Sequence, residues 1–275
     1  MTTTEIDPDR LTRLANQWKA DLQSWAIPSE ILDQAPEPPW SHPVAMFTVS
    51  DEVPDSISHQ RAREALPNNG SVLDVGSGGG RASMAITPPA GMLVAVDHQQ
   101  GMLDEFTNAA RARGVTAHTY LGDWPNVADL VPEVDVVVCH HVAYNVAEIV
   151  PFLQALNDHA TKRVVLEVPM SHPMSNMNAL WKKFWDLDRP TEPTPYLLQA
   201  IAVAMGFPAV LDIWDDETWG ARVDMPQAER IKHSRVRLCL TEDRDAEVAA
   251  ALLQEQDAKP RPIATLWWDV NRDNT

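Results

Sequence analysis

The sequence predicts an α/β protein built on one doubly wound sheet of seven strands. From residue 70 onward, short apolar runs rich in β-branched residues alternate with stretches of helical periodicity, the pattern of a parallel sheet covered on both faces. Directly after the first apolar run stands a cluster of glycines, at residues 76 and 78–80. Because ligands bind at the carboxyl ends of the strands in such sheets, the glycine cluster also predicts the place of a binding site.

Each expected strand is a nearly continuous apolar run bounded by turn residues. The seven runs span residues 71–75, 92–97, 117–123, 134–140, 163–168, 208–216 and 263–270. Several of the segments between them carry apolar residues at helical spacing and are expected to form helices. Helices are expected within residues 100–114, 147–160, 195–206, 226–240 and 245–256.

Regions outside this alternation predict a cover for the sheet. Residues 1–65 contain helical patterns before and after a proline-rich connection, and we interpret them as an N-terminal helical cap. Residues 66–275 form the ligand-binding domain, with a Met- and Trp-rich lid insertion at about 170–195 and a helical insertion at about 217–260. We expect the cap and the lid to lie over the carboxyl edge of the sheet.

Composition narrows the classes of partner. The formal net charge is −17 and the longest basic stretch is "WKKF", which disfavours nucleic acid and anionic membranes as partners. The first ten residues are polar and no apolar run has the length of a membrane span, so a cytoplasmic protein is expected. Cys139 and Cys239 lie in apolar stretches without metal-binding spacing and are interpreted as buried free thiols, which suits a reducing compartment.

The glycine turn in "VLDVGSGGGR" fits S-adenosylmethionine better than a dinucleotide such as NAD. A dinucleotide fingerprint needs a third glycine where this sequence has Arg81, counting from Gly76 and Gly78. S-adenosylmethionine needs no pyrophosphate cradle, and Asp74, two residues before the first glycine, suits its α-ammonium group.

Two further strand ends carry carboxylates. Asp97 ends the second run and can accept the ribose hydroxyls of either adenosine ligand. Asp123 follows the third run and can accept the adenine amino group, while Trp124 beside it can cover the ring. The competing interpretation of this pair is a surface turn with a core tryptophan.

With these motifs the chain resembles the class I S-adenosylmethionine-dependent methyltransferases, whose sheet is Rossmann-like. The matching segments are "VLDVGSGGG", "AVDHQQGML", "GDW" and "VDVVVCHHVAYNV". The phrases "PPWSHP", "RVVLEV", "LDRP" and "LWWDV" resemble an actinobacterial subgroup of small-molecule methyltransferases, in which the acceptors associated with members are sugars. The resemblance implies S-adenosylmethionine as cofactor, bound by Asp74, Gly76, Ser77, Gly78, Asp97, His98, Met102, Asp123, Trp124 and His140.

The catalytic candidates follow the fourth and fifth strands. An acceptor hydroxyl must lose a proton, and histidine is the natural base. The resemblance directs His141 and Tyr144 toward the acceptor, so we predict His141 as general base and Tyr144 or Asn145 as an orienting group. Glu167 and His172, near the end of the fifth strand, are predicted to bind or polarise the acceptor hydroxyl.

The other histidines have no evident partner in the sequence. His59, His118, His159 and His233 are interpreted as surface residues, and His42 as a loop residue or a cover of the site. No metal site is predicted, although the acidic stretch "DIWDDE" leaves a metal-assisted variant open.

The predicted function is methyl transfer from S-adenosylmethionine to a hydroxyl oxygen of a sugar or similar small metabolite, by a monomer or homodimer. The alternatives are a carboxylate or nitrogen acceptor, an NAD-dependent oxidoreductase and a binding module that no longer catalyses. Arg81 and the absence of a Tyr-x-x-x-Lys pair disfavour the oxidoreductase.

Overall fold

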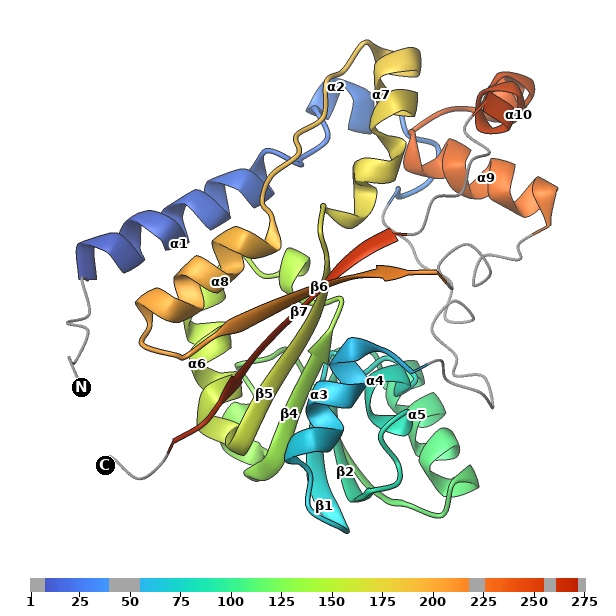
Figure 1. Ribbon diagram of the computed structural model, residues 1–275. Coiled ribbons are helices and arrows are strands. Elements are labelled where there is room, and N and C mark those ends of the chain that lie inside the picture. Colours follow the sequence, from blue (N-terminus) through green and yellow to red (C-terminus); the bar gives the residue numbers. More distant parts are fainter. Residues whose placement is uncertain (1–7, 40–54, 218–225, 255–260, 272–275) are drawn as a thin grey trace.

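The computed structural model describes residues 8–39, 55–217, 226–254 and 261–271. It confirms the predicted seven-stranded sheet, in the order β3-β2-β1-β4-β5-β7-β6 (Figure 1). The strands are β1 (Gly70–Val75), β2 (Ala90–Asp97), β3 (Thr116–Leu121), β4 (Val134–His140), β5 (Ala160–Pro169), β6 (Val210–Asp216) and β7 (Arg261–Asp269). Because the chain leaves β1 toward one side and returns at β4 on the other, the order reverses between these two central strands, and such a reversal opens a crevice at their carboxyl ends.

One strand differs from the parallel arrangement that the alternation predicts. β7 lies between β5 and β6 and runs antiparallel to both. The helices that precede it, α9 (Gln227–Arg237) and α10 (Asp245–Gln254), stay beside the carboxyl edge instead of crossing back over a sheet face (Figure 1). The chain therefore re-enters the sheet from that edge, and β7 points the opposite way.

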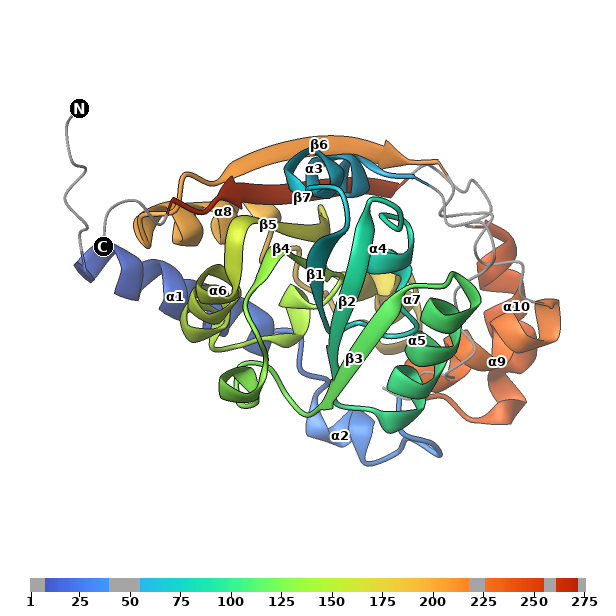
Figure 2. The same ribbon diagram turned by 90° about the horizontal axis from the view of Figure 1, so that it is seen from below.

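Two layers of helices bury the sheet. On one side are α1 (Pro8–Gln23), α6 (Ile149–His159) and α8 (Pro195–Ala204), and on the other are α4 (Arg81–Met84) and α5 (Gln100–Ala112) (Figure 2). Neighbouring strand residues face opposite layers: Leu73 and Trp268 belong to the core under α6 and α8, and Val72 and Trp267 to the core under α5. The near-continuous apolar runs in the sequence reflect burial on both faces.

Helix α3 (Ile57–Ala65) belongs to the sheet rather than to the cap in which the sequence analysis placed it. It packs against β5, β4 and β7, and Ala62 lies in the same core as the residues under α5. The predicted boundary after residue 65 therefore separates α3 from the sheet on which it packs. What remains of the predicted cap is α1, which packs on α8 and α6, and α2 (Ser29–Leu32).

A third apolar core lies above the carboxyl ends of β4 and β5 (Figure 1). Three segments distant in the chain build it: the stretch around α2, helix α7 (Asn178–Trp185) with the turn before it, and helices α9 and α10. We call these segments the cover. Arg189 joins two of them, because its guanidinium lies 5.3 Å from the ring of Trp25 and 5.2 Å from that of Trp181, and donates to the Ala26 carbonyl at 3.1 Å.

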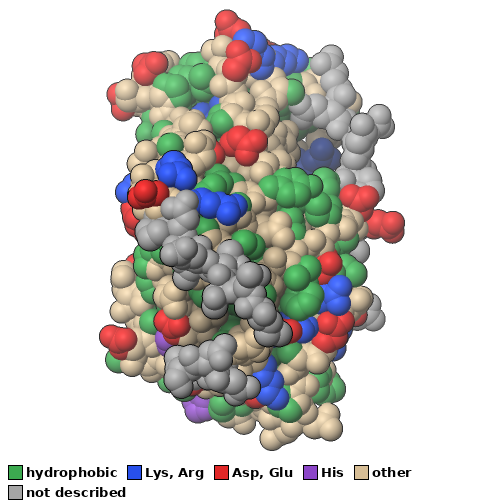
Figure 3. Space-filling view, turned by 60° about the vertical axis from the view of Figure 1, so that its left-hand side comes forward, with side chains coloured by type: hydrophobic (Ala, Val, Ile, Leu, Met, Phe, Trp, Pro, Cys, Tyr) green, Lys and Arg blue, Asp and Glu red, His purple; other side chains and the backbone are tan. Residues whose placement is uncertain are grey.

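The surface mixes charges of both signs. On the face in Figure 3, acidic and basic side chains alternate with small apolar groups, and the described residues there form no continuous basic area. None of the helices within the described ranges combines the length and the apolar content that a membrane span requires.

Candidate active site

The glycine turn lies at the carboxyl end of β1, between β1 and α4. Gly76, Gly78 and Gly80 have φ values of +67°, +50° and +95°, which L residues with side chains rarely adopt. A Cβ atom on Gly76 would lie 2.4 Å from Cγ2 of Val142, in the loop after β4. The backbone N–H groups of Gly76 and Ser77 donate to the Val96 carbonyl, at 2.8 and 3.1 Å, so the turn is fastened to β2.

Two buried carboxylates flank this turn. Asp97 accepts the Gly78 N–H at 2.9 Å with Oδ2 and the Gln99 N–H at 2.9 Å with Oδ1. Asp74 accepts the Ser83 hydroxyl at 2.7 Å, and its burial, aided by the negative charge of Asp97, raises its pKa to about 7. A cationic ligand beside the turn would stabilise the ionised form of Asp74, which is what the predicted α-ammonium group supplies.

Replacing Asp97 with alanine is expected to weaken binding of S-adenosylhomocysteine by about 1–3 kcal/mol. The variant loses the predicted contact to the ribose hydroxyls and also two hydrogen bonds that hold the loop backbone. Calorimetric titration measures this directly. Asp104→Ala is the control, because Asp104 is exposed on α5 and its carboxylate accepts a hydrogen bond from the exposed Gln100 amide. Equal affinities of the two variants would contradict the assignment.

The other predicted cofactor residues are less closely grouped. His98 is exposed with its Nδ1 3.6 Å from Asp97 Oδ1, and Met102 is buried in the first turn of α5. Asp123 is exposed just beyond β3. The ring of Trp124 packs edge-on against His159, the last residue of α6, with centroids 4.8 Å apart. This position favours a packing role for Trp124, and its contact with adenine stays a prediction.

His140, His141 and Glu167 come together at the ends of β4 and β5. The two strands pair in parallel, with His140 opposite Glu167. Glu167 is buried, and its Oε1 lies 3.0 Å from His141 Nε2 while its Oε2 lies 4.0 Å from His140 Nδ1. Although burial opposes ionisation, the neighbouring histidines, of which His141 donates a hydrogen bond to the carboxylate, hold the pKa of Glu167 well below its usual range. The carboxylate is therefore ionised at neutral pH.

The two histidines of this pair differ in environment. Burial lowers the pKa of His140 to about 3, so its imidazole is neutral, and its buried Nε2 has no hydrogen-bond partner among the described residues. A buried polar atom without a partner is costly, so the site fits a ligand that supplies one. His141 is partly exposed and has φ +62°, a strained conformation for a residue with a side chain.

Sequence reasoning missed two residues of this cluster, both on α3. Ser56, the N-cap of α3, donates its hydroxyl to Glu167 Oε2 at 3.0 Å. His59 was interpreted as a surface residue, but it is buried, and its ring lies 5.4 Å from that of His140. The capping pattern of serine followed three residues later by a side chain that bonds back was visible in "SISH", but only the fold brings it to β5.

Tyr144 and His172 lie where the cover meets the sheet. The Tyr144 hydroxyl donates to the Pro169 carbonyl at 2.8 Å, and burial raises its pKa. His172 stacks on Trp25 with centroids 4.0 Å apart and meets Tyr144 edge-on at 5.3 Å. Its Nδ1 accepts the Met174 N–H at 3.2 Å, and burial lowers its pKa to about 4. His172 is thus neutral, with its proton on Nε2.

The structure brings most of the predicted residues to one edge of the sheet. No group of three or more histidine, cysteine or acidic side chains in the described part of the chain has the arrangement of a metal site. In the acidic stretch after residue 211, the carboxylate of Asp212 accepts hydrogen bonds from Arg61 and Trp267. His42 lies outside the described residues.

Comparison with known proteins agrees with this geometry. Residues 72–162 match the family described as the methyltransferase domain. No curated protein sequence matches the chain significantly. Among solved structures, YjhP of Escherichia coli superposes with a TM-score of 0.54 and 16% identity, over 83% of this chain and 98% of that one. YcgJ of Bacillus subtilis gives a TM-score of 0.49 and 19% identity, over 78% and 98% of the two chains.

The matched segment contains the glycine turn, both flanking carboxylates and the pair of histidines. The match supports S-adenosylmethionine, the adenosine ligand that the sequence analysis favours over NAD. Residues 72–162 therefore resemble a methyltransferase domain and lie on a Rossmann-like seven-stranded sheet, and the match implies S-adenosylmethionine as the cofactor.

Proposed function

We propose that the protein methylates a hydroxyl oxygen of a small acceptor, a sugar or a related metabolite, with His141 as general base. The observation that carries the proposal is the 3.0 Å contact between His141 Nε2 and Glu167 Oε1 at the carboxyl edge of the sheet. An ionised carboxylate takes the N–H of the ring, which leaves Nδ1 as the proton acceptor. The same carboxylate stabilises the imidazolium that forms when His141 takes a proton.

When bound, the cofactor supplies a methyl group that is already activated on a sulfonium. The residues of the chain then have to hold the acceptor in line and remove its proton. Asp74, Asp97 and the glycine turn hold one side of the site, and His141 with Glu167 stands on the other, at the ends of β4 and β5. The cover, in which Trp25 stacks on His172, lies over the carboxyl ends of β4 and β5 and limits the access of water to the site from that side.

His172 and Tyr144 have roles other than base in this proposal. Because His172 Nδ1 already accepts a backbone N–H, its Nε2 presents a proton and can donate to a second oxygen of the acceptor. The proton of Tyr144 is used by the Pro169 carbonyl, so its oxygen can only accept. An acceptor with neighbouring oxygens, as in a sugar, suits this pairing of a donor and an acceptor.

The proposal also places the enzyme in the cytoplasm. Cys139 and Cys239 are free, buried thiols. Disulfides are rare where glutathione keeps thiols reduced, so two unpaired cysteines suit that compartment.

The test is a screen for acceptors with purified protein and S-adenosylmethionine labelled in the methyl group. Sugars, vicinal diols, carboxylic acids and amines are offered separately, and the product is read by carbon NMR, in which O-methyl ethers, methyl esters and N-methyl groups have distinct shifts. We expect an O-methyl ether. A methyl ester or N-methyl product would replace the hydroxyl acceptor by one of the alternatives.

A further inference from the structure

The N-terminal turn of α3 contacts Glu167, the partner of the candidate general base His141 in the proposed active site. Ser56 is buried at the N-cap of α3, and its hydroxyl donates to Glu167 Oε2 at 3.0 Å, across 111 residues of chain. The other oxygen of the same carboxylate holds His141 Nε2 at 3.0 Å. Glu167 thus stands between a serine on one element and the candidate base on another.

A capping box holds the Ser56 hydroxyl in place. His59 Nδ1 accepts the backbone N–H of Ser56 at 3.1 Å, and the His59 N–H donates to Ser56 Oγ at 3.3 Å. Nδ1 of His59 already accepts a hydrogen bond from the backbone. The better acceptor for the hydroxyl hydrogen of Ser56 is therefore the Glu167 carboxylate, with which the hydrogen bond is charge-assisted.

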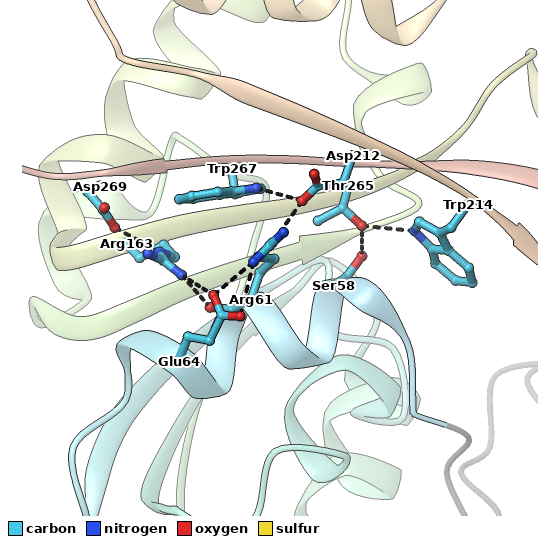
Figure 4. A network of polar contacts seen from close by, with 9 residues as sticks. All are labelled: Ser58, Arg61, Glu64, Arg163, Asp212, Trp214, Thr265, Trp267 and Asp269. Carbon is cyan, nitrogen blue, oxygen red and sulfur yellow. Dashed lines mark hydrogen bonds and ion pairs between the residues drawn. The ribbon is translucent and has the colours of Figure 1, made fainter.

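The body of α3 is anchored to the sheet by a separate network (Figure 4). The Ser58 hydroxyl bonds that of Thr265 on β7 at 2.7 Å, and Arg61 donates to Asp212 on β6 at 2.8 Å. Arg163 on β5 reaches Glu64 at 3.1 Å. These contacts fix the helix over β5, β6 and β7, so the N-terminal turn has a defined position relative to Glu167.

We propose that Ser56 is a positioning residue that orients Glu167 toward His141. This inference rests on the proposed function, in which His141 is the base. One oxygen of the carboxylate is held by α3, so the other stays directed at the imidazole. Without the hydroxyl, the carboxylate can rotate, and His141 loses the acceptor that makes its Nδ1 more nucleophilic.

The experiment measures the nucleophilicity of His141 without needing an acceptor. The reagent is diethylpyrocarbonate, which reacts with neutral imidazole nitrogens, and mass spectrometry follows the peptide of His141 against that of the exposed His118 on β3. Ser56→Gly removes the hydroxyl but keeps an acceptable N-cap, since glycine is well tolerated at that position. Its expected effect is a loss of about three- to tenfold in the His141 rate relative to His118.

Three further variants separate positioning from a structural effect. Ser56→Thr keeps the hydroxyl and is expected to react like the wild type, whereas Glu167→Gln is expected to slow His141 at least as much as Ser56→Gly. Ser58→Ala is the matched control, because it removes a buried hydroxyl bond from the same helix turn without touching Glu167, and His141 should keep its rate. Ser56→Cys, which is nearly isosteric, replaces the glycine variant if that variant does not fold.

Different outcomes reject different statements. Wild-type reactivity in Ser56→Gly together with slow reaction in Glu167→Gln overturns the role of Ser56 alone. Equal slowing in Ser56→Gly and Ser58→Ala also overturns it, because the effect is then one of general loosening. Unchanged reactivity in Glu167→Gln would show that Glu167 does not activate His141, and it would contradict the assignment of His141 as the base. Failure of the acceptor screen does not affect this measurement, because it needs no acceptor.

Discussion

Replacing His141 with glutamine is expected to slow methyl transfer by about 10²–10⁴-fold at saturating cofactor. Glutamine can keep the contact to Glu167 through its amide N–H, but it cannot accept a proton from the acceptor. Binding of S-adenosylhomocysteine should be nearly unchanged, because the glycine turn and its two carboxylates lie on β1 and β2 rather than β4. Single-turnover measurement with an acceptor found by the screen separates the two effects.

The comparison with His172→Gln identifies the base. His172 presents an N–H rather than a lone pair, so its replacement should raise the KM for the acceptor more than it lowers the turnover rate. If His141→Gln instead keeps near-wild-type turnover while His172→Gln abolishes it, the base is His172. If both variants remain fully active, the acceptor is already ionised at neutral pH, as a carboxylate is, and the hydroxyl acceptor is wrong.

Replacing Asp74 with asparagine is expected to stabilise the ligand-free protein relative to the wild type as the pH rises. The pKa of Asp74 is raised by burial from 3.8 to about 7 in the folded chain. Between these two values the unfolded chain has released a proton that the folded chain still binds, so this group favours folding at acid pH. Its contribution is lost as the pH rises through about 7, and asparagine has no such dependence.

The expected size follows from the width of this window. One pKa unit corresponds to about 1.4 kcal/mol, so between about pH 5 and pH 8 the variant should gain about 2–3 kcal/mol on the wild type. Urea unfolding at the two pH values measures the change. Asp135→Asn is the control with no expected change: burial opposes ionisation of Asp135, but two hydrogen bonds from Ser71 lower its pKa below 3.8. Asp135 is therefore ionised in both the folded and the unfolded chain between about pH 5 and pH 8, and the stability difference between this variant and the wild type should be the same at both pH values.

The Asp74 variant should bind the cofactor less well although it is more stable at alkaline pH. In the wild type the affinity for S-adenosylhomocysteine should rise as Asp74 ionises, because its ammonium group pairs with the carboxylate. In Asp74→Asn the affinity should be lower and flat over the same range. Equal affinities at pH 8 would show that Asp74 is a structural residue of the turn, and its burial would then have no function in binding. A buried charge kept for a ligand at a cost in stability is a common feature of active sites.

The strands and the cofactor were predictable because burial leaves a signature in the sequence. Strands covered on both faces need apolar residues at nearly every position, and the runs from Leu93 to Val96 and from Val136 to Cys139 are that signature. The turn at Gly76–Gly80 was recognisable because only glycine tolerates its backbone angles. The segment that matches a methyltransferase domain could therefore be located from local pattern.

The pairing of β4 with β5 could also be anticipated, and with it the proximity of His141 and Glu167. Residues at the carboxyl ends of adjacent parallel strands meet at one edge of the sheet, so two polar residues that end such runs are expected to be neighbours. Trp124 was less predictable. Local sequence placed it after a strand end, but the side chain turns back to pack on His159 of α6, because a large ring is stabilised more by burial than by exposure at an edge.

The sequence by itself determined the seven strands and the glycine turn and favoured the cofactor, since each depends on residues close together in the chain. Tertiary structure alone decided the direction of β7, the union of three distant segments into one cover, and the contacts of Ser56 and His59 with the catalytic candidates. The physical reason is that a serine at a helix N-cap has the same local signature wherever the helix lies. Only the packing of α3 on β5 brings its hydroxyl within 3.0 Å of a carboxylate 111 residues away.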